Sequence, residues 1–235
     1  ASLAAQERPA DAVWVIADNC TDDTGSVAKA GGAQVYTTVE NIDRKAGGLN
    51  QLLNRLLPGA DADDAFLVMD ADTVLAPQFL LVASQALEAN PELDAVGGVF
   101  RGEPGGGLIG LLQRNEYDRY SRDISRRQAR VFVLTGTASL FRADTLAAVT
   151  QSRGRNLPGS PGRVYDTVAL TEDNELTLAV RSLGADLLSP QECRVSTELM
   201  PTWGDLWRQR MRWQRGALEN IGAYGLTSAT ARYWM

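Results

Sequence analysis

The sequence contains no histidine and very few cysteines and lysines. Its 235 residues include two cysteines, Cys20 and Cys193, and two lysines, Lys29 and Lys45. The lack of histidine excludes Ser-His-Asp and Cys-His relays and every histidine-ligated metal centre. The two cysteines provide neither a disulfide framework nor the spacing of a zinc site. Proton transfer would therefore depend on a carboxylate, and a bound metal on oxygen ligands.

The sequence also lacks an excess of positive charge and a long apolar run. Its net charge of −6 argues against a general binder of nucleic acids or anionic membranes, because both kinds of protein present a broad cationic surface, so any bound anion must be met by a local cluster. No stretch reaches the ~20 apolar residues needed to span a bilayer, and the N-terminus has no signal-peptide pattern. Because 44% of the residues are apolar, the chain can bury a sizeable core. We expect one domain that is soluble by itself.

The first half of the sequence alternates β-rich runs with helix-like segments, a pattern typical of βαβ units around a largely parallel sheet. Strands are predicted at residues 12–17, 34–37, 65–69, 95–100, 131–134, 138–141 and 195–198. Helices are predicted at residues 24–31, 46–57, 77–89, 108–127, 171–184 and 203–224. Residues 152–162, rich in Gly, Pro and Ser, predict a mobile surface loop. The fold class is therefore α/β.

Acidic residues follow two of the predicted strands. Asp18 comes after the first strand, and Asp70 and Asp72 come after the third. In open α/β sheets, ligands bind beyond the carboxyl ends of the strands, so these side chains are expected at one edge. Asp70 and Asp72 can offer oxygen ligands to Mg²⁺ or Mn²⁺ together with a substrate phosphate. Each group also has a local explanation, because aspartate is common in turns and helix caps.

Two further segments carry candidate chemistry. Lys45 is followed by two glycines and Asn50, which permits close approach of the backbone to an anion, although a surface lysine in an ordinary loop has the same pattern. The run Thr171-Glu172-Asp173 begins a predicted helix, where a carboxylate pKa is lowered and an ionised base is favoured. Helix capping alone also explains such a run.

The segment from Trp207 to Trp213, WRQRMRW, concentrates arginines and tryptophans in less than two helical turns. An amphipathic helix with arginines reaching to solvent is the usual explanation. The alternative is a local anion site, because the planar guanidinium group binds phosphate oxygens in pairs.

Taken in order, these segments resemble the motif series of the processive family 2 glycosyltransferases, which include cellulose, chitin, hyaluronan and poly-N-acetylglucosamine synthases. The matching positions are Asp18, Lys45-x-Gly-x-x-Asn50, Asp70-x-Asp72, Thr171-Glu172-Asp173 and Gln209-x-x-Arg212-Trp213. The resemblance implies a GT-A fold, with a Rossmann-like mixed sheet flanked by helices. It also implies inverting transfer from a UDP-sugar to a growing polysaccharide, with Mg²⁺ or Mn²⁺ as cofactor.

The resemblance also assigns roles on the donor side. Asp18 would contact the uracil or ribose, and Lys45 would lie near the diphosphate. Asp70 would contact the nucleotide or sugar. Asp72, with Asp70, would ligate the metal, and Arg212 would pair with the diphosphate.

On the acceptor side, the resemblance implies that Asp173 is the general base that deprotonates the acceptor hydroxyl. Glu172, Thr135 and Gly136 would line the acceptor site. Gln209 and Trp213 would hold the acceptor sugar, the indole stacking on it.

The resemblance further implies a nucleotide-binding half at residues 1–100, an acceptor and catalytic half at 101–202, and a membrane-interface helix at 203–235. The segment from Gly216 to Met235 fits a membrane interface, because Tyr224, Tyr233 and Trp234 suit that zone, and a packed cytosolic helix is the alternative. The family's opening strand and its transmembrane helices have no counterpart here. We therefore expect part of a longer protein at the cytoplasmic face of the cell membrane, with little or no activity in this chain.

Two other functions remain open. A non-processive family 2 transferase would add one sugar to a lipid or protein, and a non-catalytic nucleotide-binding domain would use the carboxylates only as turns and caps. The sequence does not distinguish glucose from N-acetylglucosamine as the donor sugar, since many side chains can build an acetamido pocket.

Overall fold

The β-strands of the computed structural model, which describes residues 2–234, pair into separate sheets. A parallel pair consists of β1 (Trp14–Ala17) and β2 (Gln34–Thr37). The central sheet has the order β3 (Ala65–Met69), β7 (Ala138–Arg142), β5 (Leu93–Gly97) and β8 (Asp186–Leu188). A third sheet has the order β4 (Val74–Leu75), β9 (Arg194–Thr197) and β6 (Val99–Gly102).

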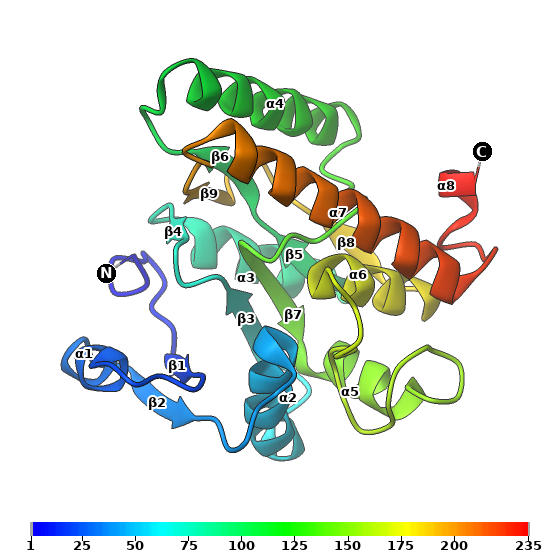
Figure 1. Ribbon diagram of the computed structural model, residues 1–235. Helices are drawn as coiled ribbons and strands as arrows, with labels where there is room; N and C mark the ends of the chain where they lie inside the picture. The colour runs from blue at the N-terminus through cyan, green and yellow to red at the C-terminus, as the bar shows by residue number, and fades with distance from the viewer. Residues whose placement is uncertain (1, 235) are drawn as a thin grey trace.

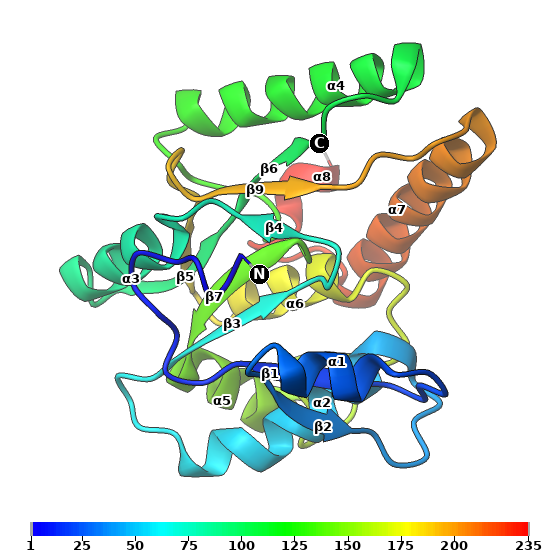
Figure 2. The ribbon, with the colours of Figure 1, turned by 90° about the vertical axis from the view of Figure 1, so that its left-hand side faces the viewer.

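Helices cover these sheets and extend beyond them (Figures 1 and 2). Their bounds are α1 (Thr24–Ala30), α2 (Arg44–Leu56) with the short η1 (Leu57–Gly59), α3 (Phe79–Ala89), α4 (Gly107–Arg126), α5 (Ala143–Ser152), α6 (Glu172–Ser182), α7 (Trp203–Tyr224) and α8 (Ala231–Trp234). In both views, β1, β2 and α1 lie at one end of the molecule and α4 lies at the other. None of the helices described is long and apolar enough to cross a membrane.

The predicted α/β class is confirmed, but the prediction of a largely parallel sheet is wrong. In the central sheet β7 runs antiparallel to both β3 and β5, while β5 and β8 are parallel. Met69 at the end of β3 pairs with Ala138 at the start of β7. This register brings the residue after β3 next to the turn before β7, and both carry predicted site residues.

Two of the predicted strands differ in the structure. In both cases the hydrogen-bond partners of the segment are distant in the sequence, so a local sequence pattern does not reveal them. The run predicted at 95–100 splits into β5 and β6 at Gly98, whose N–H donates to the Ala138 carbonyl at 2.8 Å as the chain passes from one sheet to the next. The run at 131–134 forms no strand. There the Leu134 N–H donates to the Thr177 hydroxyl at 3.0 Å, so a side chain takes the place of a neighbouring strand.

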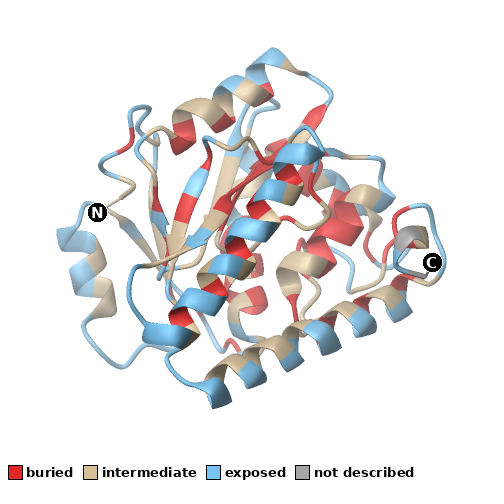
Figure 3. Ribbon diagram, turned by 90° about the horizontal axis from the view of Figure 1, so that it is seen from above, coloured by how far each residue is buried: buried red, intermediate tan, exposed pale blue. Residues whose placement is uncertain are grey.

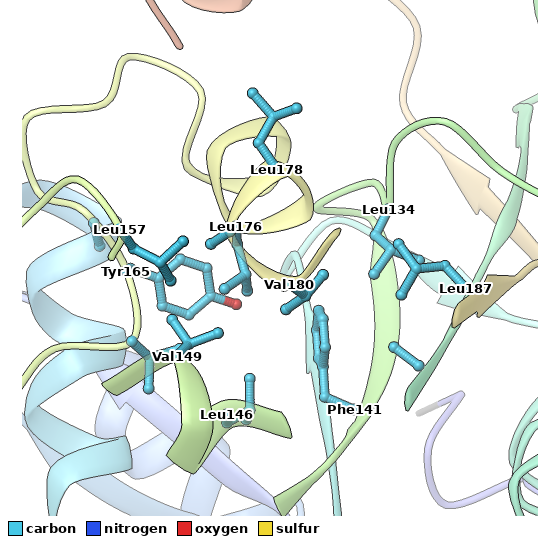
Figure 4. Packing of buried hydrophobic residues seen from close by; sticks show 14 of the residues in the cluster. Leu134, Phe141, Leu146, Val149, Leu157, Tyr165, Leu176, Leu178, Val180 and Leu187 are labelled. Carbon is cyan, nitrogen blue, oxygen red and sulfur yellow. The ribbon is translucent and has the colours of Figure 1, made fainter. Parts of the chain in front are cut away.

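The main hydrophobic core joins α5, α6 and β7. Figure 4 shows Leu146 and Val149 of α5 facing Leu176 and Val180 of α6, with Phe141 of β7 beside Val180. Full burial of each such side chain contributes about 1.5–3 kcal/mol. This core therefore fixes α6, whose first turn carries Glu172 and Asp173.

Helix α7 is attached to α6 by one narrow stripe. Its buried residues are Gly216, Asn220 and Tyr224, spaced four apart on one face. A Cβ at Gly216 would lie 2.4 Å from the Thr171 hydroxyl, so only glycine allows this approach. Figure 3 shows the rest of α7 in exposed and intermediate colours.

Two surface predictions are corrected by a buried ion pair. Arg153, in the predicted mobile loop, is 1% exposed and forms two hydrogen bonds with the Glu175 carboxylate, at 2.5 and 2.7 Å. Tyr224, which the sequence places at a membrane interface or in a packed helix, is buried and donates to the same carboxylate at 2.5 Å, as a packed helix requires. Their polar groups need partners when buried, and Glu175 supplies them. The side chain of Trp234, also predicted at the interface, lies outside the described residues.

Candidate active site

Asp70 is placed by the pairing of β3 with β7. Its backbone N–H donates to the carbonyls of Gly136 (3.1 Å) and Thr137 (3.3 Å), so the strand end is fixed against the turn that precedes β7. Its carboxylate accepts from Lys45 Nζ. Asp72, two residues further, is exposed and accepts no hydrogen bond from the described residues.

Lys45 lies in the first turn of α2 and connects two segments that are far apart in sequence. Its ammonium group forms ion pairs with Asp70 and, at 3.1 Å, with Glu172 of α6. Burial acts to lower the pKa of Lys45, but the two carboxylates outweigh it and the pKa is raised. Lys45 therefore stays protonated and supplies a fixed positive charge to the site.

Asp173 is held by backbone donors in the first turn of α6. Its Oδ2 accepts from the Gly136 N–H at 2.9 Å and its Oδ1 from the Asn174 N–H at 2.8 Å. The prediction that the helix N-terminus lowers its pKa is wrong. Burial, followed by the neighbouring Glu172 carboxylate, raises the pKa of Asp173 and outweighs the two N–H donors and Lys45. The N-cap Thr171 makes no side-chain cap bond, so the first turn of α6 receives its side-chain acceptor from Asp173.

Gly136 stands at the point where these charged groups converge. A Cβ at this position would lie 3.2 Å from Lys45 Nζ and 3.4 Å from both Asp173 Oδ2 and Asp70 Oδ2. Any residue other than glycine at this position would therefore place its side chain in the space between the ammonium group and the two carboxylates. The structure brings four residues predicted from the sequence, Lys45, Asp70, Glu172 and Asp173, together around Gly136, which was also predicted.

Asp18 is connected to this cluster only indirectly. Its Oδ1 accepts from the Thr38 hydroxyl at 2.8 Å and from Asn41 Nδ2 at 2.7 Å. The same Asn41 amide nitrogen also donates to the Arg44 carbonyl at 2.7 Å, at the start of α2. Asn41 thus ties Asp18 to the residue before Lys45. The sequence analysis did not identify Asn41, which no motif marks.

Asn50, the last residue of the lysine motif, has a structural role that the sequence did not reveal. Its side chain accepts from the N–H groups of Val164 (3.0 Å) and Tyr165 (2.9 Å) and donates to the Tyr165 carbonyl at 2.9 Å. It therefore anchors the segment before α6 to the helix that carries Lys45.

The Gln-x-x-Arg-Trp side chains form no hydrogen bond with the carboxylate cluster in the described part of the chain. Trp213 instead borders a groove of about 540 Å³ between α4 and α7, together with Tyr117. Arg210 lies 4.3 Å from the centre of the Trp213 ring and pairs with Glu116 of α4 at 2.7 Å. Arg212 is exposed and Gln209 is half-buried. The motif nevertheless begins within two turns of Gly216, which contacts Thr171 beside Glu172.

The donor set fits a hard divalent cation bound mainly through its substrate. The described residues hold no group of three or more Asp, Glu, Cys or His side chains arranged for a metal ion. Mg²⁺ and Mn²⁺ are commonly held by one or two carboxylates plus substrate phosphates, which Asp70 and Asp72 can supply. The carboxylates of Asp70, Glu172 and Asp173 lie near the ammonium group of Lys45, and that of Asp72 lies near Asp70. The carboxylates outnumber the ammonium group, so an additional cation would balance the charge.

Comparison with known proteins places the chain in a family. A family model described as glycosyltransferase like family 2 matches residues 1–216. The chain belongs to this family. Among curated relatives of this family 2 chain are poly-beta-1,6-N-acetyl-D-glucosamine synthases from Staphylococcus epidermidis, 23% identical over 93% of the chain, and from Staphylococcus aureus strain COL, 25% identical over 88% of it. The chain spans about half the length of these relatives, 50% and 47%.

Solved structures confirm the GT-A fold of this family 2 chain. A mannosyltransferase from Pyrobaculum calidifontis in complex with GDP-Man and Mn²⁺ superposes with a TM-score of 0.65, at 19% identity over 94% of this chain and 57% of its own. Glucosyl-3-phosphoglycerate synthase from Mycobacterium tuberculosis, in complex with Mn²⁺, UDP and phosphoglyceric acid, gives 0.54, at 18% identity over 93% of this chain and 69% of its own. At these sequence identities, the similarity shows a shared fold only.

Proposed function

We propose that this chain is the catalytic domain of an inverting glycosyltransferase that moves a sugar from a UDP-sugar to a growing polysaccharide. The observation that carries the proposal is the convergence of Lys45, Asp70 and Asp173 around Gly136. A cation for the diphosphate and a carboxylate for the acceptor hydroxyl are the groups that a single displacement requires. The family membership and the polysaccharide synthases among the relatives support the substrate class.

In this proposal, Asp173 accepts the proton of the acceptor hydroxyl as that oxygen attacks the anomeric carbon. The Gly136 and Asn174 N–H groups hold the carboxylate in place, so that little reorganisation accompanies the reaction. Lys45 lies on the donor side and stabilises negative charge on the departing diphosphate. One carboxylate is sufficient for the chemistry, because an inverting displacement forms no covalent intermediate.

Asp70 and Asp72 would hold Mg²⁺ or Mn²⁺, and the structural relatives solved with Mn²⁺ support this assignment. When bound, such a cation acts as a Lewis acid toward the phosphoryl oxygens. Asp18 would contact the uracil or ribose through Oδ2, because Oδ1 is already engaged by Thr38 and Asn41. Arg212 and Trp213 would approach the diphosphate and the acceptor sugar, as the family motif implies.

Radiolabelled donor incorporation tests this proposal. The full-length parent protein, supplied separately with UDP-N-acetylglucosamine and UDP-glucose, is expected to incorporate one of them into a high-molecular-weight product with Mg²⁺ or Mn²⁺ present. Chelation of the metal is expected to abolish incorporation, because the two carboxylates at this site cannot replace a divalent cation. An α-linked product would contradict the inverting mechanism. Addition of a single sugar to a lipid would favour the non-processive alternative.

We also propose that α4 and α7 contact a membrane surface, at the cytoplasmic face as the resemblance implies. Trp203, Trp207 and Met211, spaced four apart on α7, are 55%, 68% and 48% exposed. Leu108 and Leu111 in the first turns of α4 are also exposed, and Figures 1 and 2 show the first turns of both helices on the same side of the molecule. Arginines interleave these apolar residues on α7, as in helices that lie in an anionic membrane interface.

Vesicle binding tests the membrane contact. The chain is expected to co-float with vesicles that contain phosphatidylglycerol, and replacing both Trp203 and Trp207 by Ala is expected to weaken binding by about tenfold or more, because less apolar area enters the interface. Ile42→Ala is the control, since Ile42 is 91% exposed in the segment between β2 and α2, and Figure 1 shows these two elements away from α4 and α7. Equal loss in the control, or no binding by the unmodified chain, would contradict the proposal.

A further inference from the structure

A small cavity lies at the base of the carboxylate cluster. Its volume is about 10 Å³, close to the space that one water molecule occupies. Gly136, Ser139 and Asp173 contribute polar groups to its lining, while Leu134 and Leu176 are among its apolar lining residues. A water molecule is stable in such a space only where polar partners are available to it.

Tyr165 supplies one such partner. Its side chain also lines the cavity, and the residue is 3% exposed. Figure 4 shows its hydroxyl directed into the core, toward the space between Leu176 and Phe141, both of which line the cavity as well. The hydroxyl makes no hydrogen bond with any residue described. The hydroxyl is not among the described atoms that are both fully buried and without a partner, so a small molecule in the cavity can reach it. A hydroxyl in such a place is usually paired with protein or with ordered water.

The Asp173 carboxylate has capacity for a second partner. Each of its oxygens accepts one backbone N–H, from Gly136 and Asn174, and each carboxylate oxygen can accept two hydrogen bonds. Asp173 also contributes to the raised pKa of Tyr165, after burial and Glu172, which is consistent with its carboxylate lying near the phenol. Two groups that lack a full set of partners thus line the same cavity.

We propose that the cavity binds one water molecule, which accepts a hydrogen bond from the Tyr165 hydroxyl and donates one to the Asp173 carboxylate. Tyr165 is then a positioning residue for the base. The bridge holds the carboxylate orientation and leaves a free lone pair for the acceptor hydroxyl. The water site does not depend on the proposed function. The role of Tyr165 in positioning the base does rest on the proposed function.

Unfolding measurements on this chain test the water site. If the hydroxyl has a water partner, Tyr165→Phe removes a satisfied hydrogen bond and lowers the urea midpoint, as Tyr224→Phe does by removing the bond to Glu175. If the hydroxyl has no partner, Tyr165→Phe leaves the midpoint unchanged or raises it, which overturns the proposal. Tyr36→Phe is the control, because Tyr36 is a half-buried tyrosine whose hydroxyl bonds to no described residue, and it is expected to leave the midpoint unchanged.

A high-resolution crystal structure provides the direct test. We expect a water molecule within hydrogen-bond distance of both Tyr165 Oη and an Asp173 oxygen, and its loss in Tyr165→Phe. A dry cavity, or a water that reaches only one of the two groups, overturns the proposal.

Kinetics of the full-length parent test the catalytic consequence. Tyr165→Phe is expected to lower kcat about fivefold with KM for the UDP-sugar changed less than about twofold, because one hydrogen bond to the base is lost and the donor contacts remain. An unchanged kcat overturns the positioning role. If the parent transfers no sugar at all, the proposed function fails, while the unfolding and crystallographic results still decide the water site.

Discussion

Replacing Asp173 by Asn in the full-length parent is expected to lower the rate of sugar transfer by about 10²–10⁴-fold, the usual contribution of a general base. The amide has the same shape but does not take up the proton. UDP binding should persist, since Lys45 pairs with Asp70 and Glu172, neither of which is altered. Initial rates at saturating donor and calorimetric titration with UDP provide the two measurements.

Asp144→Asn is the matched control, because Asp144 is an exposed aspartate in the first turn of α5. It should leave both the rate and UDP binding unchanged. Transfer at the normal rate by the Asp173 variant would exclude its role as base and favour a non-catalytic nucleotide-binding domain. If the Asp173 variant loses both UDP binding and sugar transfer, Asp173 is needed to maintain the structure of the site.

The pH dependence of transfer follows from the same residue. A base must be ionised to act, and the pKa of Asp173 is raised by burial and by Glu172. The rate should therefore fall as the pH decreases through this raised pKa, at higher pH than for an exposed aspartate. Because the folded-state pKa is raised, ionised Asp173 also costs stability above its unfolded-state pKa, which is consistent with a group placed for function.

Replacing Arg153 by Met is expected to lower the free energy of unfolding by about 3–5 kcal/mol, because it leaves the Glu175 carboxylate buried without its charge partner. The side chains of Arg153 and Glu175 are 0% and 2% exposed. Arg153 also donates to the carbonyls of Pro158 (2.8 Å) and Val164 (2.6 Å), which would lose these bonds. Urea denaturation of this chain measures the change.

The matched control is Arg155→Met, an exposed arginine two residues away, which should change the free energy of unfolding by less than about 0.5 kcal/mol. A double variant, Arg153→Met with Glu175→Leu, should recover part of the loss, since no buried charge is then left unpaired. A small effect of Arg153→Met alone would show that water reaches Glu175 and that the ion pair does not fix the segment before α6.

Much of the secondary structure could be predicted from local patterns. The strands at 34–37 and 65–69 and the helix at 203–224 have the predicted bounds, because period-two and helical apolar patterns report directly on each element. The division of 95–100 into β5 and β6 could not be predicted, because an unbroken apolar run does not show that the chain changes sheets at Gly98.

The buried pair of Arg153 and Glu175 was also inaccessible to local reasoning. An arginine within a Gly-, Pro- and Ser-rich segment has the composition of an exposed loop, and its partner is 22 residues away on α6. The burial of Tyr224 could not be predicted with certainty either. It depends on a contact with Glu175 of α6, and no local pattern in α7 indicates that contact.

The sequence by itself determined which kinds of chemistry this protein can use. Its lack of histidine, its carboxylates after strands and the order of its motifs restrict the protein to carboxylate chemistry and indicated the glycosyltransferase family that the family model confirms. Only the tertiary structure decided which of these groups meet. The antiparallel pairing of β3 with β7 sets Asp70 beside Gly136, and the packing of α6 on the core adds Asp173. Burial there also reverses the pKa shift expected at a helix N-terminus, because desolvation depends on neighbours that are distant in the sequence.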